Sequence, residues 1–374
     1  MSSKSIAFVL ISILAVSSSA QAASVFSNEV YSITELYPGT RAKGMGGAFI
    51  AVANDATSPF WNPAGIVRLN RPETNLEVGL ALDGTEWTGA LPPTVNWQGA
   101  VGIINATSAE GSLKQASAVN LVLPFIVSHK VRSDQSREME RVDLVVASLL
   151  GAWAAEILPG VLSVGGSLKL HGARSAIRFL QKPGAIDHVP ENYGGGAGIN
   201  LGTLIRVMPQ LSLGAVFNSP LALYWAYPDY DEEGFAKGGG DIVSQWNIGS
   251  GLALQPTEAL TLAGDVLYNR WGGLRNEFPG YENGLEIHAG GEYVVVDESK
   301  NYLYLRSGYY SSPSKYRKDN SVYYADKHHI TVGIGYEIFA SRLRLDLYAD
   351  YSFASHGLIK DPAFRSSLAF NFVF

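Results

Sequence analysis

Apolar and polar side chains alternate with a period of two residues through much of this chain, and this alternation constrains the fold more than any other feature. Between 285 and 295, apolar or small residues occupy every odd position, while Glu286, His288 and Glu292 lie between them. Successive side chains of a β-strand point to opposite faces, so such a segment is a strand with one apolar and one polar face. The chain is therefore predicted to be all-β.

The same pattern recurs from 330 to 338 and from Leu343 to Tyr351. Polar residues interleave with the apolar ones in the second of these segments, beginning one residue before it, at Arg342, Arg344, Asp346, Tyr348 and Asp350. In a soluble sandwich the apolar face of such strands meets a second sheet, whereas in a transmembrane barrel it faces lipid and the polar face lines the lumen. Alternation alone does not separate these two architectures.

The lengths of the segments and of their connections do separate them. From Thr74 onward the sequence divides into about fourteen strand-like segments of roughly nine to fifteen residues, as tilted membrane strands require. Tight connections are expected at 158–160, 207–209 and 255–256, and long ones at 175–191, 218–243, 271–283 and 310–327. Short turns on one side and long loops on the other are typical of outer-membrane barrels, although 105–115 is long where a short turn is expected. We therefore predict a transmembrane antiparallel β-barrel of about fourteen strands.

The last segment supports a closed barrel. Its apolar face consists of aromatic and aliphatic residues, namely Phe364, Leu368, Phe370, Phe372 and Phe374. An exposed apolar edge strand would be an aggregation hazard in a soluble protein, whereas a closed strand that faces lipid is not. A closing strand with a C-terminal aromatic residue resembles the signal that outer-membrane assembly machinery reads, so this machinery is an expected partner.

The N-terminus has the three parts of a secretory signal peptide. A cationic start that ends at Lys4 precedes an apolar run over 6–16 and the cleavage sequence Ala20-Gln21-Ala22. About eleven apolar residues are too few for a membrane-spanning helix, which needs roughly twenty, and charged or strongly polar residues interrupt every later stretch before it reaches that length. We therefore predict a signal peptide over 1–22 and export to the bacterial outer membrane.

Composition agrees with an exported β-barrel. The chain has 40 Gly, 19 Tyr and 15 Phe but only 17% charged residues, against about a quarter in soluble globular domains. It has no cysteine, so its stability must come from a large hydrogen-bonded surface or a large core rather than from disulfides. The net charge of −6 without a basic block excludes nucleic acid as a partner.

A block rich in glycine and alanine precedes the first predicted strand. It contains Gly44-Met45-Gly46-Gly47, then Ala51-Val52-Ala53-Asn54-Asp55-Ala56, and finally Asn62-Pro63-Ala64-Gly65. This combination resembles the N-terminal region of the FadL/TodX outer-membrane transport superfamily, and PorV/PorQ-like barrels carry a similar block. The resemblance is specific within this block and is supported elsewhere by the strand count and the terminal Phe374.

The resemblance implies a hatch, or plug, inside the barrel. In the superfamily this block forms the hatch, so we expect a plug over 23–73 and the barrel over 74–374. Proline fixes φ and lacks an N–H donor, and glycine allows close approach of two backbones, which suits a compact plug in a polar lumen. The plug motif comprises Gly44, Gly46, Gly47, Asp55, Asn62, Pro63 and Ala64.

Other interpretations of the polar and glycine-rich segments are less favoured. A phosphate cradle needs the G-x-G-x-x-G spacing or a following Lys-Ser/Thr, and 44–47 has neither. His288 with Glu286 and Glu292 is the closest approach to a catalytic cluster, but lumen positions are polar in any such barrel. The acidic loop 229–233 could bind calcium but lacks the EF-hand spacing. We predict no catalytic residue, no metal and no cofactor.

Two features are candidates for a ligand path. Phe60 and Trp61 lie beside the Asn-Pro-Ala box and could supply apolar contacts. Pro124 interrupts the third predicted strand, where it cannot donate a ladder hydrogen bond. A kink in the third strand of fatty acid transporters of this superfamily lets substrate leave sideways, so Pro124 marks a candidate lateral opening; the alternative is that it lies at the strand's end. The aromatic residues near 224–230 and 271–278 form either an interfacial girdle or a capture surface.

These features together predict transport without an enzymatic step. The candidate polar lumen residues are Glu286, His288, Glu292, Arg342, Arg344, Asp346 and Asp350. Those from Arg342 to Asp350 are expected to hold the plug. The expected partners are the lipid bilayer and a hydrophobic small molecule of fatty-acid or hydrocarbon type, although the chain is short for a long-chain fatty acid transporter. The alternative is a PorV-like barrel that binds secreted cargo or a secretion system.

Overall fold

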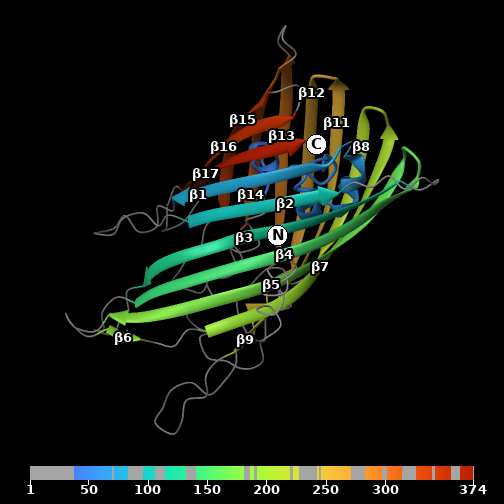
Figure 1. Ribbon diagram of the computed structural model, residues 1–374. Helices are drawn as coiled ribbons and strands as arrows, with labels where there is room; N and C mark the ends of the chain where they lie inside the picture. The colour runs from blue at the N-terminus through green and yellow to red at the C-terminus, as the bar shows by residue number, and fades with distance from the viewer. Residues whose placement is uncertain are drawn as a thin grey trace.

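The computed structural model (Figure 1) describes the plug and most of the barrel wall. The described residues are 38–69, 71–82, 96–105, 114–131, 140–180, 186–188, 192–219, 222–226, 242–243, 246–270, 283–296, 301–313, 326–338, 342–354 and 363–373. The predicted signal peptide lies outside these residues, as do Phe374, the acidic loop 229–233 and most of the aromatic loop segments.

Antiparallel strands form the wall. They are β1 (Glu73–Leu82), β2 (Asn96–Asn105), β3 (Gln115–Val131), β4 (Glu140–Leu158), β5 (Leu162–Leu180), β6 (Ile186–His188), β7 (Asn192–Met208), β8 (Leu211–Asn218), β9 (Ala222–Ala226), β10 (Ile242–Val243), β11 (Trp246–Thr257), β12 (Leu260–Arg270), β13 (Gly284–Val296), β14 (Tyr302–Ser312), β15 (Lys327–Ile338), β16 (Leu343–Ala354) and β17 (Ala363–Val373). Among the described residues, no helix is long and apolar enough to cross a membrane.

The strand pairings close the wall into a ring. Strand β1 pairs with β2 on one side and with β17 on the other, and the other wall strands pair with their neighbours in chain order. Strand β5 pairs with β7, and β8 pairs with β11, so that the short strands β6, β9 and β10 are additions to the wall. Without these three, fourteen of the 17 described strands remain in the ring, as the sequence predicted.

Several predicted connections differ from those observed. The tight turn expected at 255–256 lies instead at 258–259, and Pro256 is within β11, where the register with β12 shifts between Leu254 and Thr257. A proline lacks the N–H that the ladder needs, so it is tolerated at such an irregularity. The predicted loops 175–191 and 218–243 contain the added short strands, and β4 and β5, at 19 residues each, are longer than predicted. These two strands continue because they pair with each other from Glu140 to Leu158.

The wall has one apolar and one polar face, as the alternation predicted. On β13, Leu285, Ile287 and Tyr293 are about half exposed, whereas His288 and Glu292 are buried. Large apolar side chains are exposed in the same alternating way on the other wall strands whose side chains the structure describes, including β1 and β17. Such an extended apolar surface is unfavourable in water and suits the hydrocarbon region of a bilayer.

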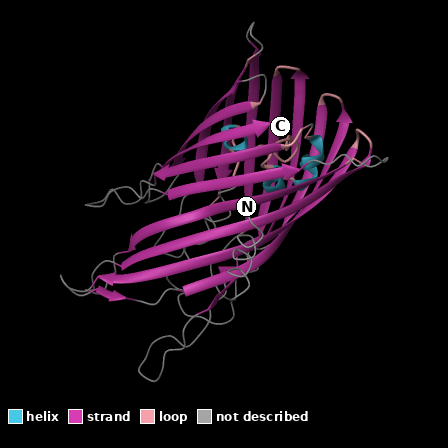
Figure 2. Ribbon diagram, in the orientation of Figure 1, coloured by secondary structure: helices cyan, strands magenta, loops and turns pink. Residues whose placement is uncertain are grey.

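The residues before β1 lie inside the ring, where the short helical segments are seen in Figure 2. They form α3 (Thr40–Gly44), α4 (Ser58–Trp61) and the 3₁₀ helix η2 (Pro63–Arg68). Their apolar side chains pack against small wall residues, including Ala253 and Ala263 on one side and Ala152 and Ala154 on another. The apolar core of this molecule therefore lies between the plug and the wall.

Candidate functional site: the plug and its seat in the lumen

Asp55 organises the middle of the plug. Its Oδ1 accepts hydrogen bonds from the backbone N–H of Thr57 at 2.9 Å and from the Thr57 hydroxyl at 2.6 Å. Its backbone carbonyl accepts from the Ser58 hydroxyl at 2.6 Å. Asp55 is 3% exposed, so these bonds replace water that the carboxylate would otherwise bind. It therefore fixes the turn that leads into α4.

Asn62 joins two parts of the plug and the wall. Its Nδ2 donates to the carbonyl oxygens of Ile50 at 2.9 Å and of Thr203 on β7 at 3.0 Å. Its Oδ1 accepts from the backbone N–H of Ala64 at 3.1 Å and so caps η2. An amide is suited to this position because it has both donors and acceptors. Pro63 follows as the first residue of η2, where its missing N–H is not needed.

The Asn-Pro-Ala box rests directly on the backbone of the wall. A Cβ at Gly165 of β5 would lie 2.6 Å from the Ala64 nitrogen and from the Pro63 carbonyl carbon. A Cβ at Gly202 of β7 would overlap the Asn62 Oδ1. The wall therefore has no side chain at the two positions where the box touches it.

The predicted glycines of the plug lie against another part of the wall. Gly46 and Gly47 have φ values of 64° and 72°, a region that residues with a Cβ rarely adopt. Gly46 also touches Gly308 of β14 so closely that a Cβ on Gly308 would overlap the Gly46 nitrogen. Gly44 faces Gly333 of β15 in a similar way. Glycine on both surfaces thus lets two backbones meet.

Two wall carboxylates bind backbone N–H groups of the plug. Glu77 of β1 accepts from the nitrogens of Gly39 at 2.7 Å and Thr40 at 2.9 Å, and from the Lys43 ammonium at 2.7 Å. Asp265 of β12 accepts from the nitrogens of Phe49 at 2.6 Å and Ile50 at 2.8 Å. Hydrogen bonds to a charged acceptor are stronger than neutral ones, so these carboxylates hold both sides of the plug.

Glu292 links the plug to a chain of buried charges in the wall. Its carboxylate accepts from Arg41 of α3 at 2.8 and 2.9 Å and from Arg306 of β14 at 2.7 Å. Arg306 also donates to Asp346 at 2.6 Å, and Asp346 in turn accepts from Arg344 at 2.8 Å. Burial by itself lowers the pKa of Arg41, but the carboxylates of Glu292 and Asp55 raise that pKa above its ordinary value. Arg41 therefore enters the lumen as a cation.

The other predicted lumen residues lie at different distances from the plug. The His288 Nδ1 donates to the Gly46 carbonyl at 2.7 Å, and its Nε2 lies 3.4 Å from Glu286. Asp350 accepts from Tyr310 at 2.9 Å, in a stack where the Tyr310 and His329 rings are 4.0 Å apart. The prediction for Arg342 was wrong, because this residue is exposed in the turn before β16 rather than buried in the lumen.

Phe60 and Trp61 are packed between plug and wall. Phe60 contacts Val122 of β3 and Leu150 of β4 and is 6% exposed. Trp61 packs edge-on against Phe49 at 6.0 Å, and its indole N–H donates to the Pro38 carbonyl at 2.8 Å. In this arrangement Phe60 fills the space beside β3 and β4, while Trp61 remains partly exposed.

Pairing along β3 is interrupted at Pro124. The register with β4 shifts between Val122 and Phe125, and pairing with β2 stops at Leu123. Strand β3 itself continues to Val131, so Pro124 lies within the strand rather than at its end. The missing N–H of proline accounts for the shift.

Sequence reasoning missed several residues that hold the plug. Arg41, Glu77, Asp265 and Arg306 were not singled out, although each wall residue among them occupies a lumen-facing position of its strand. Asp265, for example, interrupts the apolar pattern of 260–270. Collecting every charged residue at a lumen-facing position would have found the wall residues, but not their partners in the plug.

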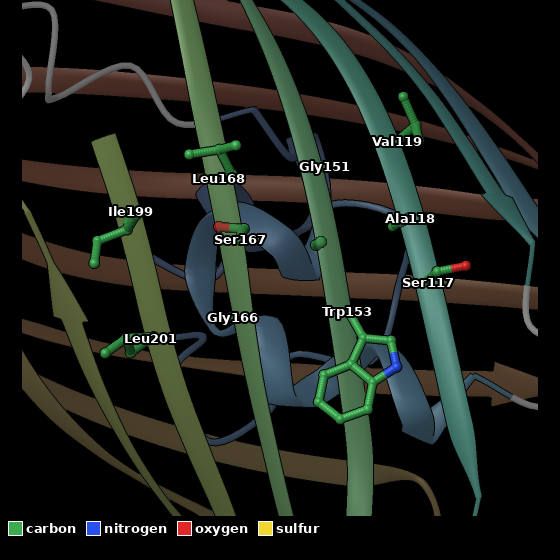
Figure 3. Close-up of a pocket in the computed structure, with 11 residues that line it drawn as sticks. Ser117, Ala118, Val119, Gly151, Trp153, Gly166, Ser167, Leu168, Ile199 and Leu201 are labelled. Atoms are coloured by element: carbon green, nitrogen blue, oxygen red, sulfur yellow. The ribbon is translucent and has the colours of Figure 1, made fainter. Parts of the chain in front are cut away.

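A shallow apolar hollow lies on the outer face of the wall, on the opposite side from the plug. Figure 3 shows it between β3 and β7, with Trp153, Leu168 and Leu201 around Gly151 and Gly166. Its volume is about 530 Å³. The hollow belongs to the apolar surface rather than to the lumen, because these large side chains are about half exposed.

The fold is similar to that of several solved structures. No protein-family model matches the chain, and no curated protein matches it. A FadL homologue of Pseudomonas aeruginosa superposes with a TM-score of 0.65 and 13% identity, over 89% of this chain and 98% of that chain. The monoaromatic hydrocarbon channel CymD has a TM-score of 0.62, 15% identity and coverages of 90% and 97%. The Pseudomonas putida toluene transporter TodX has a TM-score of 0.62 and 13% identity, over 90% of this chain and 97% of that chain. The resemblance predicted from the glycine-rich block is thereby confirmed for the fold.

Proposed function

We propose that this protein is an outer-membrane transport protein for hydrophobic small molecules. The observation that carries the proposal is a closed barrel whose lumen holds a plug, joined to the wall by charged and polar contacts as well as by apolar packing, in a fold shared with TodX and CymD. Such contacts exchange with water when the plug moves, so the lumen can open without unfolding the wall. The reaction is passage and not a covalent step.

The proposal also covers the residue ranges of the signal peptide, the plug and the barrel, and their location in the cell. Residues 1–22 direct export and are removed, 23–73 form the plug, and 74–374 form the barrel that assembly machinery inserts into the bacterial outer membrane. The apolar face of the wall supports placement in a bilayer. The tight turns, such as 159–160, then face the periplasm, and the long connections face outward.

Gating begins at the Asn62 box. Its bonds to Ile50 and Thr203 join the plug to itself and to β7, so their exchange for water frees the adjoining Phe60 and Trp61. A hydrophobic molecule then takes the place of these side chains against Val122 and Leu150. The interrupted pairing at Pro124, two residues from Val122, provides the sideways exit.

Loss of the Phe60 and Trp61 side chains is expected to reduce retention of an apolar ligand several-fold. Native mass spectrometry of protein extracted from outer membranes should detect a co-purifying hydrocarbon or lipid in the wild type and several-fold less in the Phe60→Ala/Trp61→Ala variant. Val67→Ala is the matched control, because Val67 is a buried plug residue in a separate apolar cluster. Equal ligand loss in the control would mean that plug loosening alone explains the effect. An empty barrel that retains a protein partner would favour the secretion role.

Restoring a backbone donor at Pro124 is expected to slow transport. Pro124→Val supplies the missing N–H and lets β3 pair more fully with β2 or β4, which narrows the sideways exit. Uptake of radiolabelled toluene by cells that express the variant should fall several-fold, at equal amounts of folded barrel. Pro256→Val, in the exposed end of β11, makes the same change far from β3 and should leave uptake unchanged. Wild-type uptake in the Pro124 variant would exclude an exit at this point.

A further inference from the structure

The hollow on the outer face of the wall is open and mainly apolar. Its floor is formed by the outward-facing Gly151 of β4 and Gly166 of β5. Val119, Trp153, Leu168 and Leu201 rise around this floor, as Figure 3 shows. A Cβ built on Gly151 would meet no atom within 4 Å, so the space above it is open. The volume of about 530 Å³ lies in the range of small-ligand sites.

The wall is thin where the hollow lies. On its outer face Gly151 and Gly166 have no side chain, and on its inner face Gly165 carries the Asn-Pro-Ala box directly on its backbone. Backbone alone therefore separates the hollow from Pro63 and Ala64 of the plug. A second barrel is a poor occupant of the hollow, because its broad surface would rest on the large side chains and not reach the floor. A narrow group can enter between these side chains.

One end of the hollow is polar. The Trp153 indole N–H donates to the Gln115 Oε1 at 3.2 Å, and Gln115 is the first residue of β3. Indole and amide groups of this kind are favoured where the hydrocarbon region meets the head groups of a bilayer. The polar end points toward the side of the tight turn at 159–160, and the apolar floor continues away from it.

We propose that this hollow binds one acyl chain of a phospholipid in the periplasmic leaflet, with the glycerol and head group beside Trp153 and Gln115. The proposal rests on the membrane placement in the proposed function but not on transport of any ligand. The hollow is continuous with the apolar surface that faces lipid. No side chain fills the space above Gly151, so an acyl chain can lie there. The bound acyl chain lies against the thin part of the wall, on whose inner face the Asn-Pro-Ala box rests.

Filling the hollow tests the proposal. Gly151→Leu places a side chain over the floor without a clash, because its Cβ has open space. Gly172→Leu is the matched control, since Gly172 of β5 has equally open space and does not line the hollow. The full-length proteins are reconstituted in nanodiscs of phosphatidylethanolamine and phosphatidylglycerol, released in mild detergent, and analysed by native mass spectrometry. Equal thermal unfolding of the three proteins shows that the barrels are intact.

The expected result is one retained phospholipid in the wild type and in Gly172→Leu, and roughly tenfold lower occupancy in Gly151→Leu. Equal occupancy in all three, no retained phospholipid in the wild type, or a free fatty acid in its place overturns the proposal. Should Gly151→Leu not fold, phospholipids with brominated acyl chains provide a second test, because they should quench a fluorescence component that Trp153→Phe removes. A barrel that binds phospholipid but takes up no toluene would overturn the transport proposal and leave this one standing.

Discussion

Glu292→Gln is expected to lower the free energy of unfolding by roughly 3–5 kcal/mol and to open the lumen. The carboxylate lies between two guanidinium groups, one from Arg41 of the plug and one from Arg306 of the wall. Glutamine keeps the shape but removes the charge, so two buried cations then face each other without their shared anion. The plug end that carries Arg41 should leave its seat. Denaturant unfolding followed by tryptophan fluorescence measures the stability, and conductance in planar bilayers measures the opening.

Glu258→Gln provides the control for this charge change. Glu258 is exposed in the turn between β11 and β12, so its neutralisation should change stability by no more than about 0.5 kcal/mol. A Glu292 variant with the unfolding midpoint and conductance of this control would show that Glu292 does not hold the plug. A Glu292 variant that loses stability but conducts like the wild type would show that Glu292 stabilises the wall and does not hold the plug.

Gly308→Ala is expected to displace the plug turn at 45–47 from the wall. The added methyl group would overlap the Gly46 nitrogen, which belongs to a backbone and cannot rotate away. Overpacking of this kind costs about 1–3 kcal/mol or more when the neighbours cannot move. Because Gly46 also donates to Thr331 at 3.0 Å and its carbonyl accepts from His288, one displacement breaks several contacts. Protease cleavage of the plug should become several-fold faster.

The matched control for Gly308→Ala is the same substitution at Gly264. Gly264 lies on β12, and a methyl group added there would lie 3.7 Å from its nearest contact, the His288 carbonyl oxygen. That distance is an ordinary van der Waals contact, so Gly264→Ala should be cleaved at the wild-type rate. Equal cleavage rates in the two variants would falsify the interpretation of Gly308 as a seat for the plug.

The hydrogen-bonded wall could be predicted because its pattern is local. A period of two residues places each side chain on one face, so the lumen positions of Glu286, His288 and Glu292 followed from the sequence without knowledge of any partner. The same reasoning failed for Arg342, which continues the alternation but lies in the turn before β16 begins at Leu343. A strand's end depends on where its pairing stops, and alternation does not record that.

The two prolines in strands show the same difference. Pro124 and Pro256 both lack an N–H; the sequence left open whether Pro124 lies within its strand or at its end, and it placed Pro256 in a turn. Both lie in strands, each at a shift of register. The missing N–H of proline accounts for the irregularity at both positions, while the pairing of the neighbouring strands decided its form.

The sequence by itself determined the alternating faces, the closing strand and the glycine-rich composition of the plug, because each depends on residues that are near one another in the chain. Only the tertiary structure decided which groups meet across the lumen. Arg41 meets Glu292, and Asp265 meets the nitrogens of Phe49 and Ile50, across more than two hundred residues of chain. The register of each strand and the closure of the ring set these contacts, and a slip of one residue would turn the side chains of Glu292 and Asp265 to the opposite face of the wall.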